Sequence, residues 1–430
     1  MESDRFHPAS PQGIVPELSL WRVPSTQESI EDTIEYEVRP VSTYSPHTPI
    51  KLHIKNAHDE YVMLNKCEMY ITLKLKINDT KPVTEQDWAK ITPVNNMFHS
   101  LFRKVNLRIN NSEVSDESTN YAYKAYFETL LGYSPEAKKL AAGTTVWGLP
   151  VERNSILVSH LSTDKATSTV RLGGPLHLDL AFQSKAILGG TDFFIELVPN
   201  ALGFYINSDS TVSLDVVWED AVLFIHKTRV TKPLERAHLM SLERTPARYP
   251  YTRTEVRSYT VSQGRTNAII DNLVTGVLPR RVFIAAVNDK VFTTNPKSDP
   301  LKFVNANISQ LALFIDGKQY PQTSYSPDFA NKLVTREYRG LLKALNQDGN
   351  QANFDININD WTESPVFGFN LQPDIGSWAG EGDLVGKKKH GQIRMQVKFA
   401  SALTEAITFL AYLEYDSCME INHFGEVQIN

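Results

Sequence analysis

The chain carries the same pattern of residues twice. Val105, Leu107 and Ile109 alternate with polar residues up to a turn at Asn110-Asn111, and Leu311, Leu313 and Ile315 do the same up to Asp316-Gly317, 206 residues later. An apolar helix pattern follows each turn, at Tyr123, Phe127, Leu130 and Leu131 and, 211 residues later, at Val334, Tyr338, Leu341 and Leu342. A third run, Leu176, Leu178, Leu180 and Phe182, matches Ile393, Met395, Val397 and Phe399 at an offset of 217 residues. Loop insertions between two copies of one fold would produce such a growing offset.

A duplicated β domain with a helix at the same place in each copy indicates a shell-building protein rather than a catalyst. The length of 430 residues suits two or three domains, and two halves of this size can each bury a core. The net charge of −5 is small, so it gives no broad electrostatic reason for tight binding to nucleic acid or to an anionic membrane.

Most of the chain outside the two helices has the period-2 alternation of β-strands. Leu73, Leu75 and Ile77 alternate with polar residues, and so do Leu214, Val216 and Trp218. Many such runs with long connections favour a β-sandwich or jelly roll over a parallel α/β sheet, which needs a helix after each strand. The sequence therefore predicts an all-β fold.

The domain organisation follows from these patterns. Residues 1–30, polar and proline-rich, are expected to form a flexible N-terminal arm. The first β domain is predicted at 31–232, a linker at 233–250 and the second domain at 251–430. Between Lys227 and Arg257 there are eight lysines or arginines and three glutamates. This basic strip, with Lys227, Arg229, Lys232 and Arg236 as its candidates, is either a solvated connection or a surface that faces a packaged genome or an acidic neighbour.

The two cysteines, Cys67 and Cys418, lie far apart in strand-like runs and are expected to be free thiols in a reducing compartment. The N-terminus lacks the apolar segment of a signal peptide, and no stretch of about 18 apolar residues predicts a membrane span.

No motif predicts catalytic residues, a metal site or a cofactor. The common zinc signatures are absent, and the segment Gly382 to Lys387 has the wrong spacing for a phosphate-binding loop. Asp215 and Glu219 could share the outward face of one strand, which leaves a glycosidase as a weak alternative, but nothing else in the chain supports an enzyme.

One segment resembles a known family. Phe102 to Asn111, a strand and a turn, is followed by the tyrosine-rich helix of Tyr121 to Tyr133, which contains the sequence YKAYFETLL. This segment is similar to the major capsid proteins of Polinton (Maverick) elements and adintoviruses. Phe314 to Lys318 and Arg336 to Leu342 in the second copy fit the same pattern.

The resemblance implies two tandem jelly-roll barrels (a double jelly roll), each with a short helix insertion. It also implies a structural protein without catalytic residues, whose homotrimers form pseudo-hexameric, hexon-like capsomers. These would tile an icosahedral capsid around double-stranded DNA, beside minor or penton capsid proteins and with at most non-specific DNA contact. The protein is then expected in the virion capsid after assembly inside the host cell.

Aromatic residues in charge-poor stretches are the candidate assembly contacts: Trp361, Phe367, Phe369 and Trp378. The alternative is that they anchor the core or a loop. The main alternative for the whole chain is a non-viral carbohydrate-binding protein built from two β-sandwiches.

Overall fold

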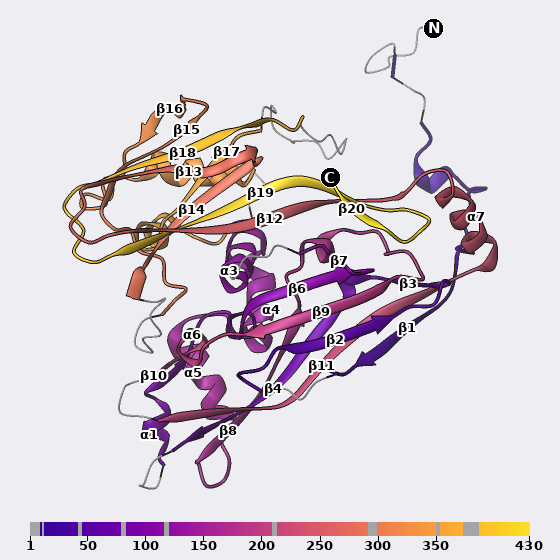
Figure 1. Cartoon of the computed structure of the whole chain (residues 1–430), viewed down its shortest axis with the longest axis horizontal. Helices are drawn as coiled ribbons and strands as arrows, with labels where there is room; N and C mark the ends of the chain where they lie inside the picture. Colours follow the sequence, from indigo (N-terminus) through magenta and orange to yellow (C-terminus); the bar gives the residue numbers. More distant parts are fainter. Residues whose placement is uncertain are drawn as a thin grey trace.

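The protein is described from a computed structural model, which covers residues 9–10, 13–41, 45–78, 83–115, 120–208, 213–290, 299–349, 353–372 and 387–430. Antiparallel strands form two barrels in chain order, with a layer of helices between them (Figure 1). Both predictions, an all-β fold and two tandem jelly rolls, are confirmed at this level.

Two four-stranded sheets packed face to face form the first barrel. One sheet has the order β1-β11-β4-β8 and the other the order β2-β9-β6-β7. Their bounds are β1 Ile30–Val38, β2 Ile50–Lys55, β4 Glu68–Ile77, β6 Phe102–Ile109, β7 Ser112–Glu113, β8 Thr167–Pro175, β9 Asp192–Pro199 and β11 Leu214–Val230. A short strand, β3 (Glu60–Val62), extends the first sheet, and β5 (Ile91–Pro93) pairs with β10 (Ile206–Ser208) at one end.

The second barrel repeats this arrangement with the sheets β12-β19-β14-β17 and β13-β18-β15-β16. Its strands are β12 Ala247–Val261, β13 Asn267–Val277, β14 Arg281–Asn288, β15 Ile308–Ile315, β16 Lys318–Tyr325, β17 Val366–Asn370, β18 His390–Phe399 and β19 Ile407–Ile421. The final strand, β20 (Val427–Ile429), pairs with the end of β19. If the eight main strands of each barrel are numbered in chain order, both barrels have one sheet of order 1-8-3-6 and another of order 2-7-4-5.

The register repeats as well. Val105, Leu107 and Ile109 lie opposite Leu197, Ile195 and Phe193, and Leu311, Leu313 and Ile315 lie opposite Val397, Met395 and Ile393. The tight turns also match, since Asn110 and Asn111 have φ of 47° and 68° and Asp316 and Gly317 have φ of 48° and 81°. Two successive positive φ angles are typical of two-residue hairpin turns. The predicted duplication is therefore present in strand order, register and turn geometry.

The third sequence match, however, was assigned to the wrong segment. Residues 176–182 form an extended connection and a short 3₁₀ helix, η3 (Asp179–Phe182), and the strand equivalent to β18 is β9. Phe193 corresponds to Ile393, so the true offset is 200 residues. Leu176, Leu178 and Leu180 alternate because they are buried in the first core, whereas Phe182 is 55% exposed. Alternation of apolar residues thus arose here without strand pairing.

The helices lie mainly between strands β7 and β8 and between β16 and β17. The first connection holds α3 (Tyr121–Gly132), α4 (Pro135–Thr145) and α5 (Pro150–Ser159), and the second holds α8 (Thr335–Ala344) and α9 (Ile358–Glu363). The insertions are therefore longer than the single short helix predicted for each barrel. The other short elements are α1 Glu85–Trp88, α2 Met97–Ser100, α6 Leu202–Tyr205, η1 Pro16–Leu18 and η2 Leu64–Lys66.

The connection between the barrels differs from a plain linker. It forms a helix, α7 (Lys232–Leu242), and β12 then begins at Ala247, within the predicted linker of 233–250. Pro233 lies in the first turn of α7, where a proline has no hydrogen bond to lose. Pro233 therefore starts a helix, and Pro250 lies within an edge strand.

Candidate functional site

Helix α3 joins the two hydrophobic cores. Its Tyr121 and Ala125 belong to the core of the first barrel, whereas Tyr123 and Phe127 belong to that of the second. The ring of Phe127 lies 5.1 Å from Phe303 and 5.4 Å from Tyr412, both in the second half of the chain. The tyrosine-rich motif that carried the family resemblance is therefore the contact between the barrels.

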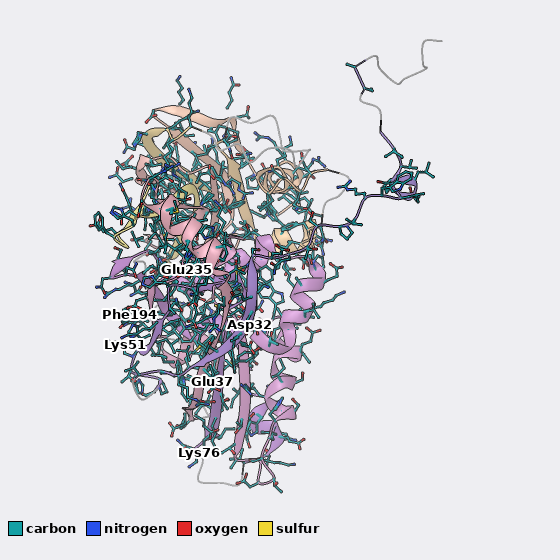
Figure 2. The ribbon with its side chains drawn as sticks, turned by 90° about the vertical axis from the view of Figure 1, so that its right-hand side faces the viewer. Asp32, Glu37, Lys51, Lys76, Phe194 and Glu235 are labelled. Carbon is teal, nitrogen blue, oxygen red and sulfur yellow. The ribbon has the colours of Figure 1, made fainter. Side chains whose placement is uncertain are left out.

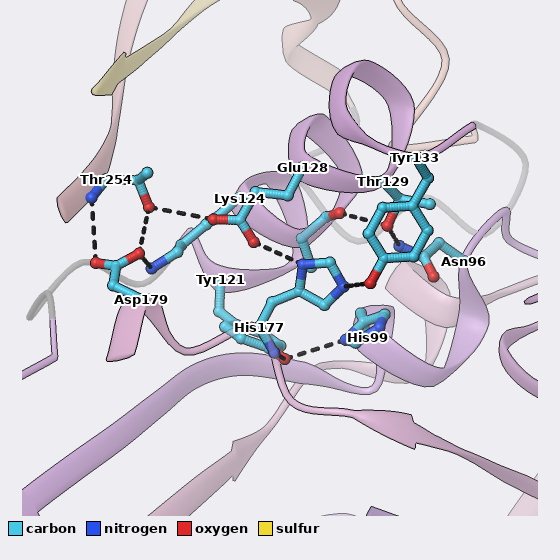
Figure 3. A network of polar contacts seen from close by, with 11 residues as sticks. Asn96, His99, Tyr121, Lys124, Glu128, Thr129, Tyr133, His177, Asp179 and Thr254 are labelled. Atoms are coloured by element: carbon cyan, nitrogen blue, oxygen red, sulfur yellow. Dashed lines mark hydrogen bonds and ion pairs between the residues drawn. The ribbon is translucent and has the colours of Figure 1, made fainter. Parts of the chain in front are cut away.

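A buried polar network accompanies this contact (Figure 3). Lys124 Nζ lies 2.6 Å from Asp179 Oδ1, and Asp179 accepts hydrogen bonds from the backbone amide (3.1 Å) and hydroxyl (2.7 Å) of Thr254. The Thr254 hydroxyl also reaches Glu128 at 3.2 Å, and Glu128 Oε2 lies 2.6 Å from His177 Nδ1. Because Thr254 is in β12, the first barrel holds the second through these side chains.

Two more ion pairs cross from the helical layer to the second barrel. Lys138 of α4 lies 2.5 Å from Asp355, and Arg153 of α5 lies 3.6 Å from Asp299. Burial lowers the pKa of Lys138, and the hydrogen bond and charge of Asp355 oppose that shift. Each cation is nearly covered, with 4% and 5% of its side chain exposed, so each would be costly without its carboxylate partner.

Strands of the second barrel also reach back onto the first. Tyr249 and Tyr251 of β12 and Met419 and Ile421 of β19 belong to the first core. The Tyr249 hydroxyl accepts a hydrogen bond from the Leu188 amide at 3.1 Å. The two barrels therefore share side chains at two places and form one block.

The buried His99 imidazole makes the stability of the first barrel dependent on pH. It is buried beside the hydroxyl of Tyr121 (3.0 Å) and the ring of His177 (4.4 Å), and Glu128 approaches His177 from α3. Burial, with a smaller contribution from His177, holds the pKa of His99 well below its usual value. Below about pH 6.5 the unfolded chain therefore binds a proton that the folded chain does not bind at His99.

We expect stability to fall as the pH drops below about 6.5, with a slope of up to about 1.4 kcal/mol per pH unit from this group. Thermal unfolding at pH 7.5 and pH 5.5 measures the effect. His99→Gln should reduce the difference between the two melting temperatures. An equal difference in the variant and the wild type would show that other groups cause the pH dependence.

The structure corrects the predicted assembly contacts. Trp361, Phe367 and Phe369 are at most 1% exposed and belong to the core of the second barrel, where the Trp361 indole donates to the Val366 carbonyl at 2.8 Å. They anchor the core and cannot meet a neighbouring chain through their side chains. The sequence could not distinguish the two roles, because large apolar side chains occur both in cores and in interfaces. Trp378 lies outside the described residues.

The predicted basic strip is largely neutralised within the chain. Lys227 pairs with Glu60 at 2.8 Å, Arg229 lies within 4 Å of Asp59 and Glu60, and Lys232 pairs with Asp59 and Glu235. The carboxylates that pair with the first three cations come largely from strand β3 and its preceding turn, which sequence proximity could not reveal. Arg236 is exposed on α7.

The weak enzyme alternative gains no support from the geometry. Asp215 bonds to Asn78 at 2.5 Å and Glu219 lies 3.7 Å from Lys74, and neither lines a described pocket. Within the described ranges no group of three or more His, Cys, Asp or Glu could hold a metal ion. No described helix is both long and apolar enough to span a membrane. Cys67 and Cys418 are free thiols, and burial raises the pKa of Cys67 to about 11.

Among the described residues, the N-terminal arm, a groove on the first barrel and a pocket on the second barrel are exposed to solvent. The described part of the arm, residues 13–29, runs away from the barrels (Figures 1 and 2) and exposes Leu20, Trp21 and Val23 by 75% or more. A groove of about 450 Å³ on the first barrel is lined by Glu35, Tyr70, Gly143, Thr144, Arg171, Gly173 and Phe224. A pocket of about 380 Å³ on the second barrel lies beside α8.

The cations of α8 were missed in the sequence. Arg336, Arg339 and Lys343 line the α8 pocket, and no carboxylate is among its lining residues. Their spacing of three and four residues places them on one face of a helix, which is the signal that could have identified them.

Comparison with known proteins agrees with the fold. No family model matches the chain. An uncharacterised protein of Caenorhabditis elegans is 24% identical over 365 residues, which cover 82% of this chain and 86% of that protein. A chain in the Sputnik virophage structure superposes with a TM-score of 0.63 at 13% identity and covers 100% of this chain and 94% of that one.

Two major capsid proteins are similar in the same way. The Faustovirus protein has a TM-score of 0.58 at 8% identity over 95% of this chain and 94% of its own, and the mavirus protein a TM-score of 0.53 at 10% identity over 99% and 96%. At such low identity these likenesses show the double jelly-roll fold. The proteins that share it here are structural capsid proteins and not enzymes.

Proposed function

We propose that the chain is the major capsid protein of a virus or virus-like element of the Polinton or adintovirus type. Its homotrimers would place six barrels in a pseudo-hexagonal ring and tile an icosahedral shell around double-stranded DNA. One observation carries the proposal: two barrels of equal strand order and register are fused into one block, and this block matches viral capsid chains over nearly its whole length.

The duplication explains why three chains suffice for a six-sided unit. Homo-oligomers close by rotational symmetry, and a threefold ring of two-barrel chains has six nearly equivalent positions. The shared cores and the buried network around Asp179 support this role, because the two barrels of one chain must keep a fixed angle in every copy.

The finer assignment depends on the tyrosine-rich motif and on the relative in an animal, since an element resident in a host genome would leave such relatives. We propose the virion capsid as the location of the protein, after assembly inside the host cell, with minor or penton proteins as partners. DNA contact would be non-specific at most, because the candidate cations Lys227, Arg229 and Lys232 already have carboxylate partners.

Expression of the full chain, followed by sedimentation and electron microscopy, tests the proposal. We expect shells or flat arrays of six-sided units, and closed particles should protect double-stranded DNA from nuclease. A chain that yields no particle or array under any assembly condition, including the presence of DNA and the element's other capsid proteins, would contradict it.

Deletion of the arm is expected to block shell formation and to leave trimers intact. The described arm makes one hydrogen bond outside itself and the adjoining Ile30, which the Thr231 amide donates to the Ser29 carbonyl at 3.1 Å, so the barrels depend little on the arm. Burial of each large apolar side chain on a neighbour, by contrast, contributes about 1.5–3 kcal/mol. Electron microscopy of a chain lacking residues 1–30 measures the result. Trp21→Ser should weaken shells as well, and Arg22→Ser serves as the matched control. Normal shells from the deleted chain would contradict an assembly role for the arm.

A further inference from the structure

Equivalent faces of the two barrels differ in what covers them. In the second barrel, α3 packs over the outer face of the sheet β12-β19-β14-β17, where Val256 and Tyr412 lie opposite each other and are 2% and 4% exposed. Asn120, which precedes α3, also donates to the Val256 carbonyl at 3.0 Å. This face is covered by the first barrel of the same chain at Val256 and Tyr412, and by α8 at Gly368.

The corresponding face of the first barrel is only partly covered, by α4 at β8. In the second barrel Phe283 lies opposite Gly368 and Tyr412, and in the first barrel Tyr70 lies opposite Gly173 and Val222 in the same strand positions. At this place the first barrel has the groove of about 450 Å³, which Gly143 and Thr144 of α4 border.

Carboxylates border this face of the first barrel. Glu31, Asp32, Glu35 and Glu37 are all exposed on β1, which is the edge strand of the sheet and the counterpart of β12. Figure 2 looks onto this side of the first barrel and labels Asp32 and Glu37. Glu35 lines the groove, with His226 at 3.3 Å, and Glu37 pairs with Arg39.

The second barrel carries positive charge on α8, the helix that occupies the place in the second barrel that α3 occupies in the first. Helix α3 lies in the connection before β8, and α8 lies in the connection before β17, the equivalent strand of the second barrel. Arg336, Arg339 and Lys343 of α8 are exposed. Arg336 donates to the Ser324 carbonyl at 2.6 Å, but Arg339 and Lys343 have no ion-pair partner among the described residues. Like charges four residues apart disfavour a helix, so an anionic partner would stabilise this face.

We infer that the α8 face of one copy docks on the β1 face of a second copy, with Arg339 and Lys343 beside Glu35 and Glu37. The inference rests on the proposed trimer and specifies its contact. Each junction between chains then repeats the junction within a chain, since a helix from one barrel covers the outer sheet of the next. Apolar and buried polar contacts fix the junction within a chain. The junction between chains would instead use exposed opposite charges, because such charges guide folded chains toward each other.

Charge reversal on each side tests the inference. One variant carries Arg339→Glu and Lys343→Glu, a second carries Glu35→Lys and Glu37→Lys, and a third combines all four changes. Because like charges at an interface are strongly unfavourable, we expect each of the first two to weaken trimers at least about 10-fold, and the third to recover most of the loss. Light scattering coupled to size exclusion measures the mass, and circular dichroism checks that each variant is folded.

The matched control is Lys51→Glu with Lys55→Glu, two exposed lysines four residues apart on β2, in the other sheet of the first barrel. This variant should remain trimeric. Trimers that are unaffected by either reversal, or a fourfold variant no better than the single-sided ones, would overturn the inference and leave the proposed function standing. A wild-type chain that never trimerises would overturn both.

Discussion

Asp179→Ala is expected to lower the free energy of unfolding by about 3–5 kcal/mol, because it removes the carboxylate that pairs with the buried Lys124 ammonium at 2.6 Å. Lys124 and Asp179 are 8% and 7% exposed, so water cannot replace the lost carboxylate. The change also removes the acceptor of two hydrogen bonds from Thr254, which tie β12 to the first barrel. Denaturant unfolding followed by fluorescence measures the loss.

Glu219→Ala is the matched control for this change. The Lys74–Glu219 pair spans 3.7 Å, and its side chains are 44% and 40% exposed, so its removal should cost about 0–1 kcal/mol. If Asp179→Ala destabilised the chain no more than Glu219→Ala, the buried network would contribute nothing to joining the barrels.

Phe127→Ala should cost about 3–5 kcal/mol, because it opens a cavity between Phe303 and Tyr412 at the junction of the barrels. We also expect the unfolding transition to broaden or split, since the shared core is what couples the two barrels into one cooperative unit. Calorimetry of the purified chain shows both effects.

Phe424→Ala is the control for the loss of a phenyl ring, because Phe424 is 76% exposed. Surface changes of this kind usually stay within about 0.5 kcal/mol. A single sharp transition at the wild-type temperature in Phe127→Ala would show that α3 does not join the barrels.

The duplication could be predicted from the sequence because strand alternation and turn residues depend on residues close together in the chain. Alternation at Leu311 to Ile315 and the turn at Asp316-Gly317 depend on neighbouring residues alone, and the structure confirms both. The same logic misassigned residues 176–182, whose buried leucines alternate without pairing to another strand. It also missed α7, whose pattern was obscured by the prolines and charges around it.

The candidate contacts were harder to predict because burial depends on tertiary neighbours. Trp361 and Phe367 are large aromatic residues, which occur in interfaces as well as in cores, and the structure buries both in the core of the second barrel. Lys227 and Arg229 lie in a basic stretch of sequence, but residues about 170 positions earlier supply their counter-charges. The motif of α3 was identified as a family signature, and only the fold shows that its Phe127 reaches the second barrel.

The mass of the purified chain in solution, combined with electron microscopy class averages, shows whether two-barrel chains form six-sided trimers. We expect particles of three chains, each of 48.5 kDa, that appear as six lobes around a threefold axis. A monodisperse monomer of two lobes at micromolar concentration and physiological salt would contradict this expectation.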